Sequence, residues 1–146
     1  MNPKFDYIIG IDPDTDKSGF AVWDCRLKRF HSITALKFWD LHSAISEFYW
    51  NYKVHVIIDA GWLNKKSNFH HRPYQSKQTG EKISEKVGRN HQVGILIHEF
   101  CEDLGISNNL HYPSGKINQQ HFTRITKYQG RTNQDMRDAA MLVYQN

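Results

Sequence analysis

Residues 7–23 read Tyr-Ile-Ile-Gly-Ile-Asp-Pro-Asp-Thr-Asp-Lys-Ser-Gly-Phe-Ala-Val-Trp, and this stretch decides the fold. Its first part is an apolar run that ends at Asp12, and a second apolar run opens at Gly19. The turn between them holds two more aspartates, Asp14 and Asp16. Short apolar runs bounded by turn residues are typical of strands. The stretch therefore predicts two neighbouring strands, with negative charge concentrated where the first one ends.

The composition of the whole chain is that of a single folded domain. The chain has 146 residues, of which 39% are hydrophobic and 13% aromatic, so one domain spanning 1–146 can bury its own core. No apolar run approaches the ~18 residues that a membrane span needs, and no signal peptide precedes the first strand. Cys25 and Cys101 form no CxxC pair. We therefore expect reduced, buried thiols and a cytoplasmic protein without a membrane partner.

The rest of the chain alternates strand-like and helix-like patterns. We expect strands at 6–12, 18–24, 28–36, 54–59 and 109–113, and helices at 39–52, 81–104, 117–127 and from about 133 onward. Residues 64–80 are polar and basic without a period, which predicts a long loop. Antiparallel strands come first and crossovers later, so the order predicts a mixed α/β fold.

Four aspartates form a set that points to chemistry. Asp12 and Asp59 each end an apolar strand, while Asp135 and Asp138 lie three residues apart in the last helix and so share one face of it. Any one of them alone fits a turn or a helix cap. Together they would repel unless a cation lay between them. Mg²⁺ prefers oxygen ligands, and two such ions about 3.5–4 Å apart suit phosphoryl displacement. The set therefore predicts a catalytic metal site.

Four segments in order along the chain carry a resemblance to a known family: Gly10-Ile11-Asp12-Pro13 with Ser18-Gly19-Phe20-Ala21-Val22, then Val56-Ile57-Ile58-Asp59, then Val87-Gly88-Arg89-Asn90-His91-Gln92-Val93-Gly94, and last Arg137-Asp138-Ala139-Ala140-Met141-Leu142. They resemble RuvC-type Holliday junction resolvases, in the style of a phage or mobile-element member. The resemblance implies an RNase H-like α/β fold, with a five-stranded mixed sheet flanked by helices.

The resemblance also implies an activity and an assembly. It implies a homodimer, formed through the helix at 81–104, that nicks two strands of a four-way DNA junction symmetrically in recombination and repair. Each active site would use two Mg²⁺ or Mn²⁺ ions and leave 5′-phosphate and 3′-hydroxyl ends. Lys116 matches a lysine near the scissile phosphate, and Trp62 matches an aromatic that stacks on bases near the junction centre.

Basic residues are expected to contact the DNA. The chain has 19 Lys+Arg residues against 15 Asp+Glu residues, a balance that suits a polyanionic partner. The candidate DNA contacts are Lys65, Lys66, Arg72 and Lys77 in the 64–80 segment, with Arg89, Lys127 and Arg131 elsewhere. Arg137 would contact phosphate or pair with a nearby acid.

Two departures from the family pattern leave alternatives open. Asp59 stands where the bacterial enzymes usually have Glu, and Asp14 stands where Gly is common. Asp14 would add charge beside the metals or merely form the turn. One alternative function is another RNase H-like nuclease that acts on RNA–DNA hybrid or structured RNA. A second alternative is a junction-binding module without catalysis.

Overall fold

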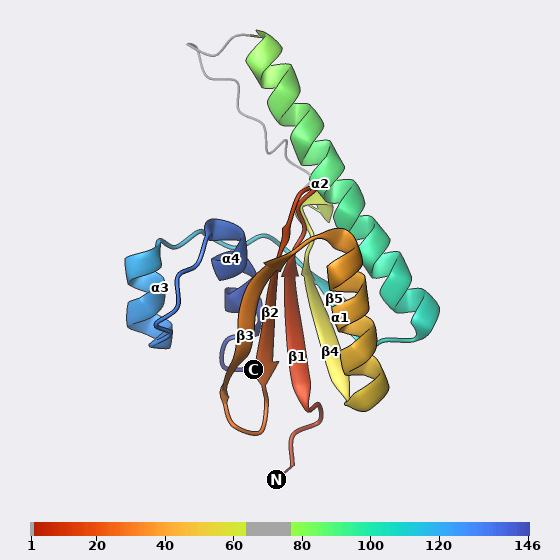
Figure 1. Ribbon diagram of the computed structural model, residues 1–146. Coiled ribbons are helices and arrows are strands. Elements are labelled where there is room, and N and C mark those ends of the chain that lie inside the picture. The colour runs from red at the N-terminus through yellow and green to blue at the C-terminus, as the bar shows by residue number, and fades with distance from the viewer. Residues whose placement is uncertain (1, 64–76) are drawn as a thin grey trace.

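A single mixed sheet forms the centre of the computed structural model, which describes residues 2–63 and 77–146 (Figure 1). Its strands are β1 (Tyr7–Asp12), β2 (Ser18–Asp24), β3 (Arg29–Leu36), β4 (Val54–Asp59) and β5 (Asn108–His111), in the spatial order β3-β2-β1-β4-β5. The first three strands form an antiparallel meander, and β4 and β5 run parallel to β1. The five-stranded mixed sheet predicted from the sequence is confirmed.

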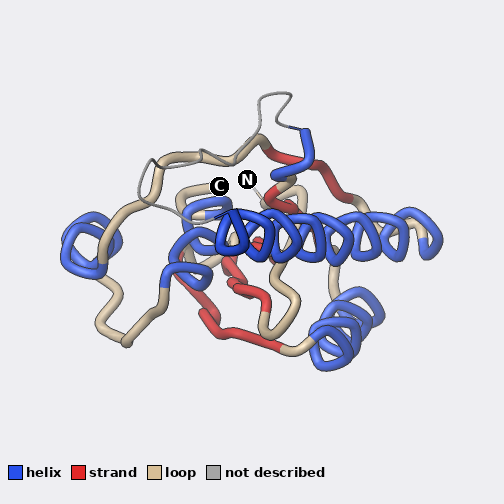
Figure 2. Tube along the Cα trace, turned by 90° about the horizontal axis from the view of Figure 1, so that it is seen from above, coloured by secondary structure: helices blue, strands red, loops and turns tan. Residues whose placement is uncertain are grey.

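Helices cover both faces of this sheet (Figures 1 and 2). They are α1 (Phe38–Asn51), α2 (Lys77–Leu104), α3 (Gln119–Thr126) and α4 (Gln134–Val143), with a short 3₁₀ turn, η1 (Gly61–Leu63), after β4. Helices α1 and α2 bury residues against one face, and α3 and α4 bury residues against the other. The sheet is therefore the middle of three layers.

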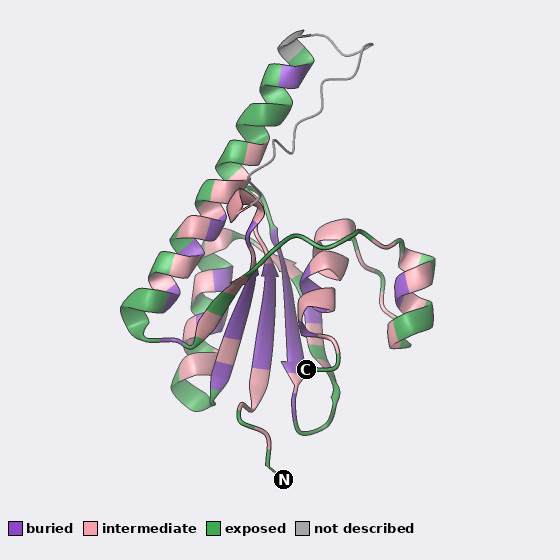
Figure 3. Ribbon diagram, turned by 180° about the vertical axis from the view of Figure 1, so that it is seen from behind, coloured by how far each residue is buried: buried purple, intermediate pink, exposed green. Residues whose placement is uncertain are grey.

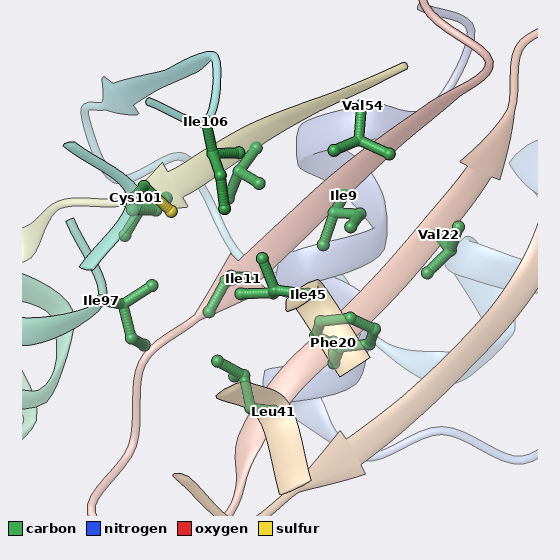
Figure 4. Packing of buried hydrophobic residues seen from close by; sticks show 12 residues of the cluster. Ile9, Ile11, Phe20, Val22, Leu41, Ile45, Val54, Ile97, Cys101 and Ile106 are labelled. Atoms are coloured by element: carbon green, nitrogen blue, oxygen red, sulfur yellow. The ribbon is translucent and has the colours of Figure 1, made fainter. Parts of the chain in front are cut away.

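Successive side chains of the central strands point alternately into two hydrophobic clusters, one on each face of the sheet. In β1, Ile9 and Ile11 point into the cluster under α1 and α2, whereas Ile8 points into the cluster under α4. Figure 4 shows Ile9 and Ile11 among the side chains of that first cluster, with Phe20 of β2 beside them. Because both faces are covered, these strands read as continuous apolar runs rather than as alternating ones.

Helix α2 begins at Lys77, four residues before the helix expected at 81–104, so the prediction of a loop through residue 80 was wrong at its end. The first part of α2 projects beyond the sheet and is largely exposed (Figure 3). Ile97 and Cys101, in its second part, are buried against the sheet. Apolar residues recur at helical spacing where a helix packs against a core. A helical segment with little to pack against therefore lacks this pattern.

Both cysteines are free and buried, as predicted. Burial raises the pKa of the Cys101 thiol to about 12, which keeps it protonated and unreactive. Within residues 2–63 and 77–146, every helix is too short or too polar to cross a lipid bilayer.

Candidate active site

Glycines on the strands let helix α4 lie directly against the sheet. A Cβ atom at Gly10 would stand 2.3 Å from the carbonyl oxygen of Ala139, and one at Gly19 would stand 1.9 Å from the carbonyl oxygen of Asp135. No side chain fits at either position, so the helix backbone occupies that space. This close approach brings the first turn of α4 to the end of β1.

Two strand ends and one helix start then meet. Asp12 and Asp59 end neighbouring parallel strands, whose preceding residues Ile11 and Ile58 pair in register. One carboxylate oxygen each of Asp12, Asp135 and Asp138 lies within 4.8 Å of the others. The fold thus brings together three of the four carboxylates that the sequence singled out, with Asp59 on the adjoining strand end.

Asp59 carries an unsatisfied oxygen. Its Oδ1 atom is buried and has no hydrogen-bond partner among the described residues. A buried polar atom without a partner costs free energy. A cation beside it would supply the missing interaction, so the donor set fits hard divalent ions, which take carboxylate oxygens.

The electrostatics of the cluster also favour a cation. Burial, together with the charges of Asp59, Asp135 and Asp138, raises the pKa of Asp12 to about 9. Burial likewise raises the pKa of Asp59, with the charge of Asp138 adding to it, and burial raises the pKa of Asp135. Without a cation, these groups can therefore all be ionised only at the cost of mutual repulsion. Bound divalent cations would offset that repulsion.

Lys116 places a positive charge beside this cluster. Its Nζ atom lies 3.5 Å from Oδ2 of Asp138, and its side chain is 71% exposed whereas that of Asp138 is 15% exposed. The Lys116 charge also lowers the pKa of Asp59 and of Asp135 against the effect of burial. The ammonium group therefore faces both the carboxylates and the solvent.

Residues of the loop before α4 fix the helix start. Asn133 caps α4 by accepting a hydrogen bond from the backbone NH of Met136 at 2.8 Å. Gln134 donates to Oδ1 of Asp138 at 2.7 Å and so orients that carboxylate. Neither role was predicted from the sequence.

Arg137 has a structural role that the sequence did not reveal. Its guanidinium donates to the carbonyl oxygens of Ile117 and Thr132, at 2.9 and 2.8 Å, and to Oε1 of Gln134 at 3.1 Å. All of these acceptors are neutral, and Arg137 forms no ion pair with an acid among the described residues, so of its two predicted roles the pairing with an acid was wrong. The guanidinium instead ties the segment that carries Lys116 to the start of α4, where backbone carbonyls offer acceptors that sequence cannot show.

A cleft of about 360 Å³ opens over the carboxylates. Its lining residues are Asp12, Pro13, Asp59, Gly61, Trp62, Val87, Asn90, His91, Pro113, Ser114, Lys116 and Asp138. Trp62 lies in the turn η1, half-buried, with its ring in edge contact with His91 at a centroid distance of 6.4 Å. The indole therefore forms part of the cleft wall rather than the tip of an open loop.

Asp14 joins the turn after β1 to helix α2. Its Oδ2 accepts from the backbone NH of Asp16 at 2.9 Å, and its Oδ1 accepts from Nδ2 of Asn90 at 3.1 Å. Asn90 in turn accepts from the NH and hydroxyl of Thr15. Asp14 therefore shapes the turn, and its charge also contributes to the raised pKa of Asp135.

The other predicted DNA contacts are dispersed. Arg89 is exposed on α2 and forms an ion pair with Glu85. Arg131 is exposed in the loop before α4, and Lys127 ends α3 beside a different cavity. Residues Lys65, Lys66 and Arg72 lie outside the described part of the chain, and only the backbone of Lys77 is described.

Sequence reasoning missed His111. This residue pairs in register with Asp59, and its charge lowers the pKa of that carboxyl. The short strand was expected, but its register against β4 is set by tertiary packing and has no signal in a single sequence.

Comparisons with known proteins support the fold. No protein-family model and no curated protein matches the sequence. Among solved structures, the chain is similar to T. thermophilus RuvC in complex with Holliday junction substrate, with 15% identity and a TM-score of 0.50, over 91% of this chain and 87% of that one. The class that the fold defines is therefore RNase H-like. At 15% identity this similarity supports a RuvC type of fold but does not show an activity.

Proposed function

We propose that this protein is a divalent-metal-dependent DNA endonuclease that resolves four-way junctions. The observation that carries the proposal is the carboxylate cluster of Asp12, Asp135 and Asp138, within 4.8 Å of one another. Asp12 and Asp138 of this cluster line a cleft together with Asp59 and Lys116. Hydrolysis of a phosphodiester needs positive charge near the reacting oxygens. Junction DNA is proposed as the substrate because the similar solved structure is that of T. thermophilus RuvC in complex with Holliday junction substrate.

Four side chains would hold the metal ions. Asp12, Asp135 and Asp138 offer the clustered oxygens, and Asp59 offers the buried oxygen that lacks a partner. Two Mg²⁺ or Mn²⁺ ions bound there would supply an activated water and stabilise the leaving 3′ oxygen. The hydrogen bond from Gln134 keeps the Asp138 carboxylate facing the site.

Lys116 would act on the phosphate itself. Its exposed ammonium lies at the rim of the cleft, 3.5 Å from Asp138. In that place it can contact a phosphate oxygen on which charge develops in the transition state. The contact with Asp138 holds the long side chain over the site when no DNA is bound.

A homodimer through 81–104 would explain paired nicking. The first part of α2 projects from the domain, and Ile83 on this part of the helix is 40% exposed. Burying this apolar side chain against a second copy would help to stabilise a dimer. Two cleavage sites would then face the two strands of one junction.

The test is a cleavage assay with a synthetic four-way junction, a linear duplex of the same sequence and an RNA–DNA hybrid, each with Mg²⁺ or Mn²⁺. We expect paired, symmetric nicks on the junction alone and their loss in Asp12→Asn. Cleavage of the hybrid in preference to the junction would overturn the assignment in favour of a different RNase H-like nuclease. Tight junction binding without cleavage under either metal would leave a binding module.

A further inference from the structure

A second cavity lies on the α4 side of the sheet, at the end away from the carboxylates. It has a volume of about 550 Å³, within the range of small-ligand sites. The end of β2, the start of β3, the end of α3 and the C-terminal residues Tyr144 and Gln145 line it. The C-terminus is marked C in Figure 1. It shares no lining residue with the cleft over Asp12. Trp23 of β2 lies four residues beyond Gly19, roughly 13 Å along the strand.

The charged side chains that line this cavity are all positive. Lys28, Arg29 and Lys127 line it, and all three are exposed. No acidic residue in the described part of the chain lines the cavity, and none of these three cations forms an ion pair with a described acid. Three unneutralised cations around one hollow favour a ligand with negative charge.

Aromatic rings form the other part of the lining. Phe30 stacks on Tyr144, with centroids 6.0 Å apart and planes 17° apart, and Tyr128 meets Phe30 edge-on at 6.0 Å. Phe30, Tyr128 and Tyr144 are half-buried, so part of each ring faces the cavity. The Tyr144 hydroxyl already donates to the carbonyl of Ile125 at 3.0 Å, which fixes the ring. A planar ligand can therefore stack on a rigid aromatic surface.

The backbone around the cavity adds an independent observation. Among the described residues, the non-glycine positions with positive φ are Lys28 (54°), Lys127 (62°) and Gln145 (61°), and all three line this cavity. Glycine adopts this conformation without steric cost, whereas other side chains are disfavoured there. Lys127 is the left-handed C-cap of α3, and Lys28 lies in the turn between β2 and β3. Lysines at two of these positions place charge in the cavity where glycine would give a more relaxed turn.

We propose that this cavity binds a nucleotide, with its phosphate among Lys28, Arg29 and Lys127 and its base against the aromatic rings. The proposal is independent of cleavage, because it uses none of the residues of the carboxylate cleft. The nucleotide can be free or part of a single strand. A base within duplex DNA is stacked on its neighbours and cannot enter such a cavity.

The test measures the binding of fluorescein-labelled oligothymidylate by anisotropy, in EDTA so that no cleavage occurs. The key variant is Lys28→Gly with Lys127→Gly, which removes two charges and relieves both positive-φ residues. We expect its affinity to fall at least roughly tenfold and the slope of log affinity against log salt to shrink by about 1, since each phosphate contact on a single strand contributes ~0.7. Its melting temperature should stay equal or rise, because glycine suits both turns.

The matched control is Lys37→Ala with Lys53→Ala, which removes the same net charge from exposed positions outside the cavity. The proposal requires the control to bind nearly as well as the parent protein. An equal loss in both double variants would overturn it, because diffuse charge would then explain binding. Competition by thymidine monophosphate would identify a free nucleotide as sufficient, and competition by the oligonucleotide alone would identify a strand. Equal competition by inorganic phosphate would contradict a role for the rings.

Discussion

The indole of Trp62 occupies the space that a side chain at Gly94 would need. A Cβ atom at Gly94 would stand 2.4 Å from Cζ3 of Trp62 and 2.9 Å from Cγ of Pro13. The glycine thus forms a notch in α2 that receives the 3₁₀ turn after Asp59. Because Trp62 lines the cleft, this notch sets the position of the cleft wall relative to the carboxylates.

Alanine at this notch should therefore destabilise the protein. We expect Gly94→Ala to lower the free energy of unfolding by about 1–3 kcal/mol, the usual cost of overpacking. Gly88, on the same helix, has no heavy atom within 4 Å of its ideal Cβ position, so Gly88→Ala should raise stability by about 0.5–1 kcal/mol through helix propensity. Urea denaturation of both variants checks the pair. Equal effects would show that the Trp62 contact does not constrain α2.

The close approach of α4 to β2 predicts a second mutational effect. Gly19→Ala would set a methyl group 1.9 Å from the Asp135 carbonyl, which no side-chain movement can relieve. We expect a loss of at least ~2 kcal/mol of stability and weaker Mn²⁺ binding, because α4 must move away with its carboxylates. Gly115→Ala is the control, since nothing lies within 4 Å of its ideal Cβ position. Unchanged metal affinity in a folded Gly19→Ala protein would refute the link between glycine packing and the site.

The carboxylate cluster makes the metal-free protein sensitive to pH. The pKa of Asp12 is about 9 in the folded protein, against an ordinary value of 3.8 for this carboxyl group. Because folding raises the pKa of this acid, the folded state is favoured most below about pH 4. That advantage is lost as the pH rises towards 9, since the unfolded state ionises more easily. In chelator, the unfolding free energy of the parent protein should fall across this window.

Asp12→Asn removes that titration. We expect the variant to be more stable than the parent at pH 8 in chelator, by about 1 kcal/mol or more, which is a shift of several degrees in Tm. The pH slope should flatten only in part, because Asp59 and Asp135 titrate in the same direction. Added Mg²⁺ should stabilise the parent and leave the variant nearly unchanged. Thermal scans at several pH values decide this, and a parent protein that gains stability with rising pH would contradict the account.

Lys116 should affect turnover more than metal binding. Lys116→Gln removes the charge that we propose to contact the phosphate, and the loss of one such group typically lowers kcat about 10²–10³-fold. Metal affinity should stay equal or increase, because a cation that competes for Asp138 is gone. Single-turnover cleavage and metal titration separate the two effects. A parallel loss of metal binding would assign Lys116 to maintaining the site rather than to the reaction.

Local pattern predicted much of this fold, and tertiary contacts explain the rest. The apolar runs ending at Asp12 and Asp59 predicted both strands, since a strand covered on two faces needs apolar residues throughout. The start of α2 at Lys77 was missed because its exposed first part has no apolar period. The register that sets His111 beside Asp59 depends on packing between distant segments, as does the cavity of Lys28 and its neighbours.

The most direct test of the central claim is a calorimetric titration with Mn²⁺ of the parent protein, Asp12→Asn and Asp16→Asn. Asp16 is an exposed aspartate of the same turn, outside the carboxylate cluster, so its variant controls for the loss of one negative charge. Saturable binding that is lost in Asp12→Asn and kept in Asp16→Asn is the predicted result. Binding of equal strength in all three proteins, or no saturable binding to the parent, would show that the carboxylate cluster is not a metal centre.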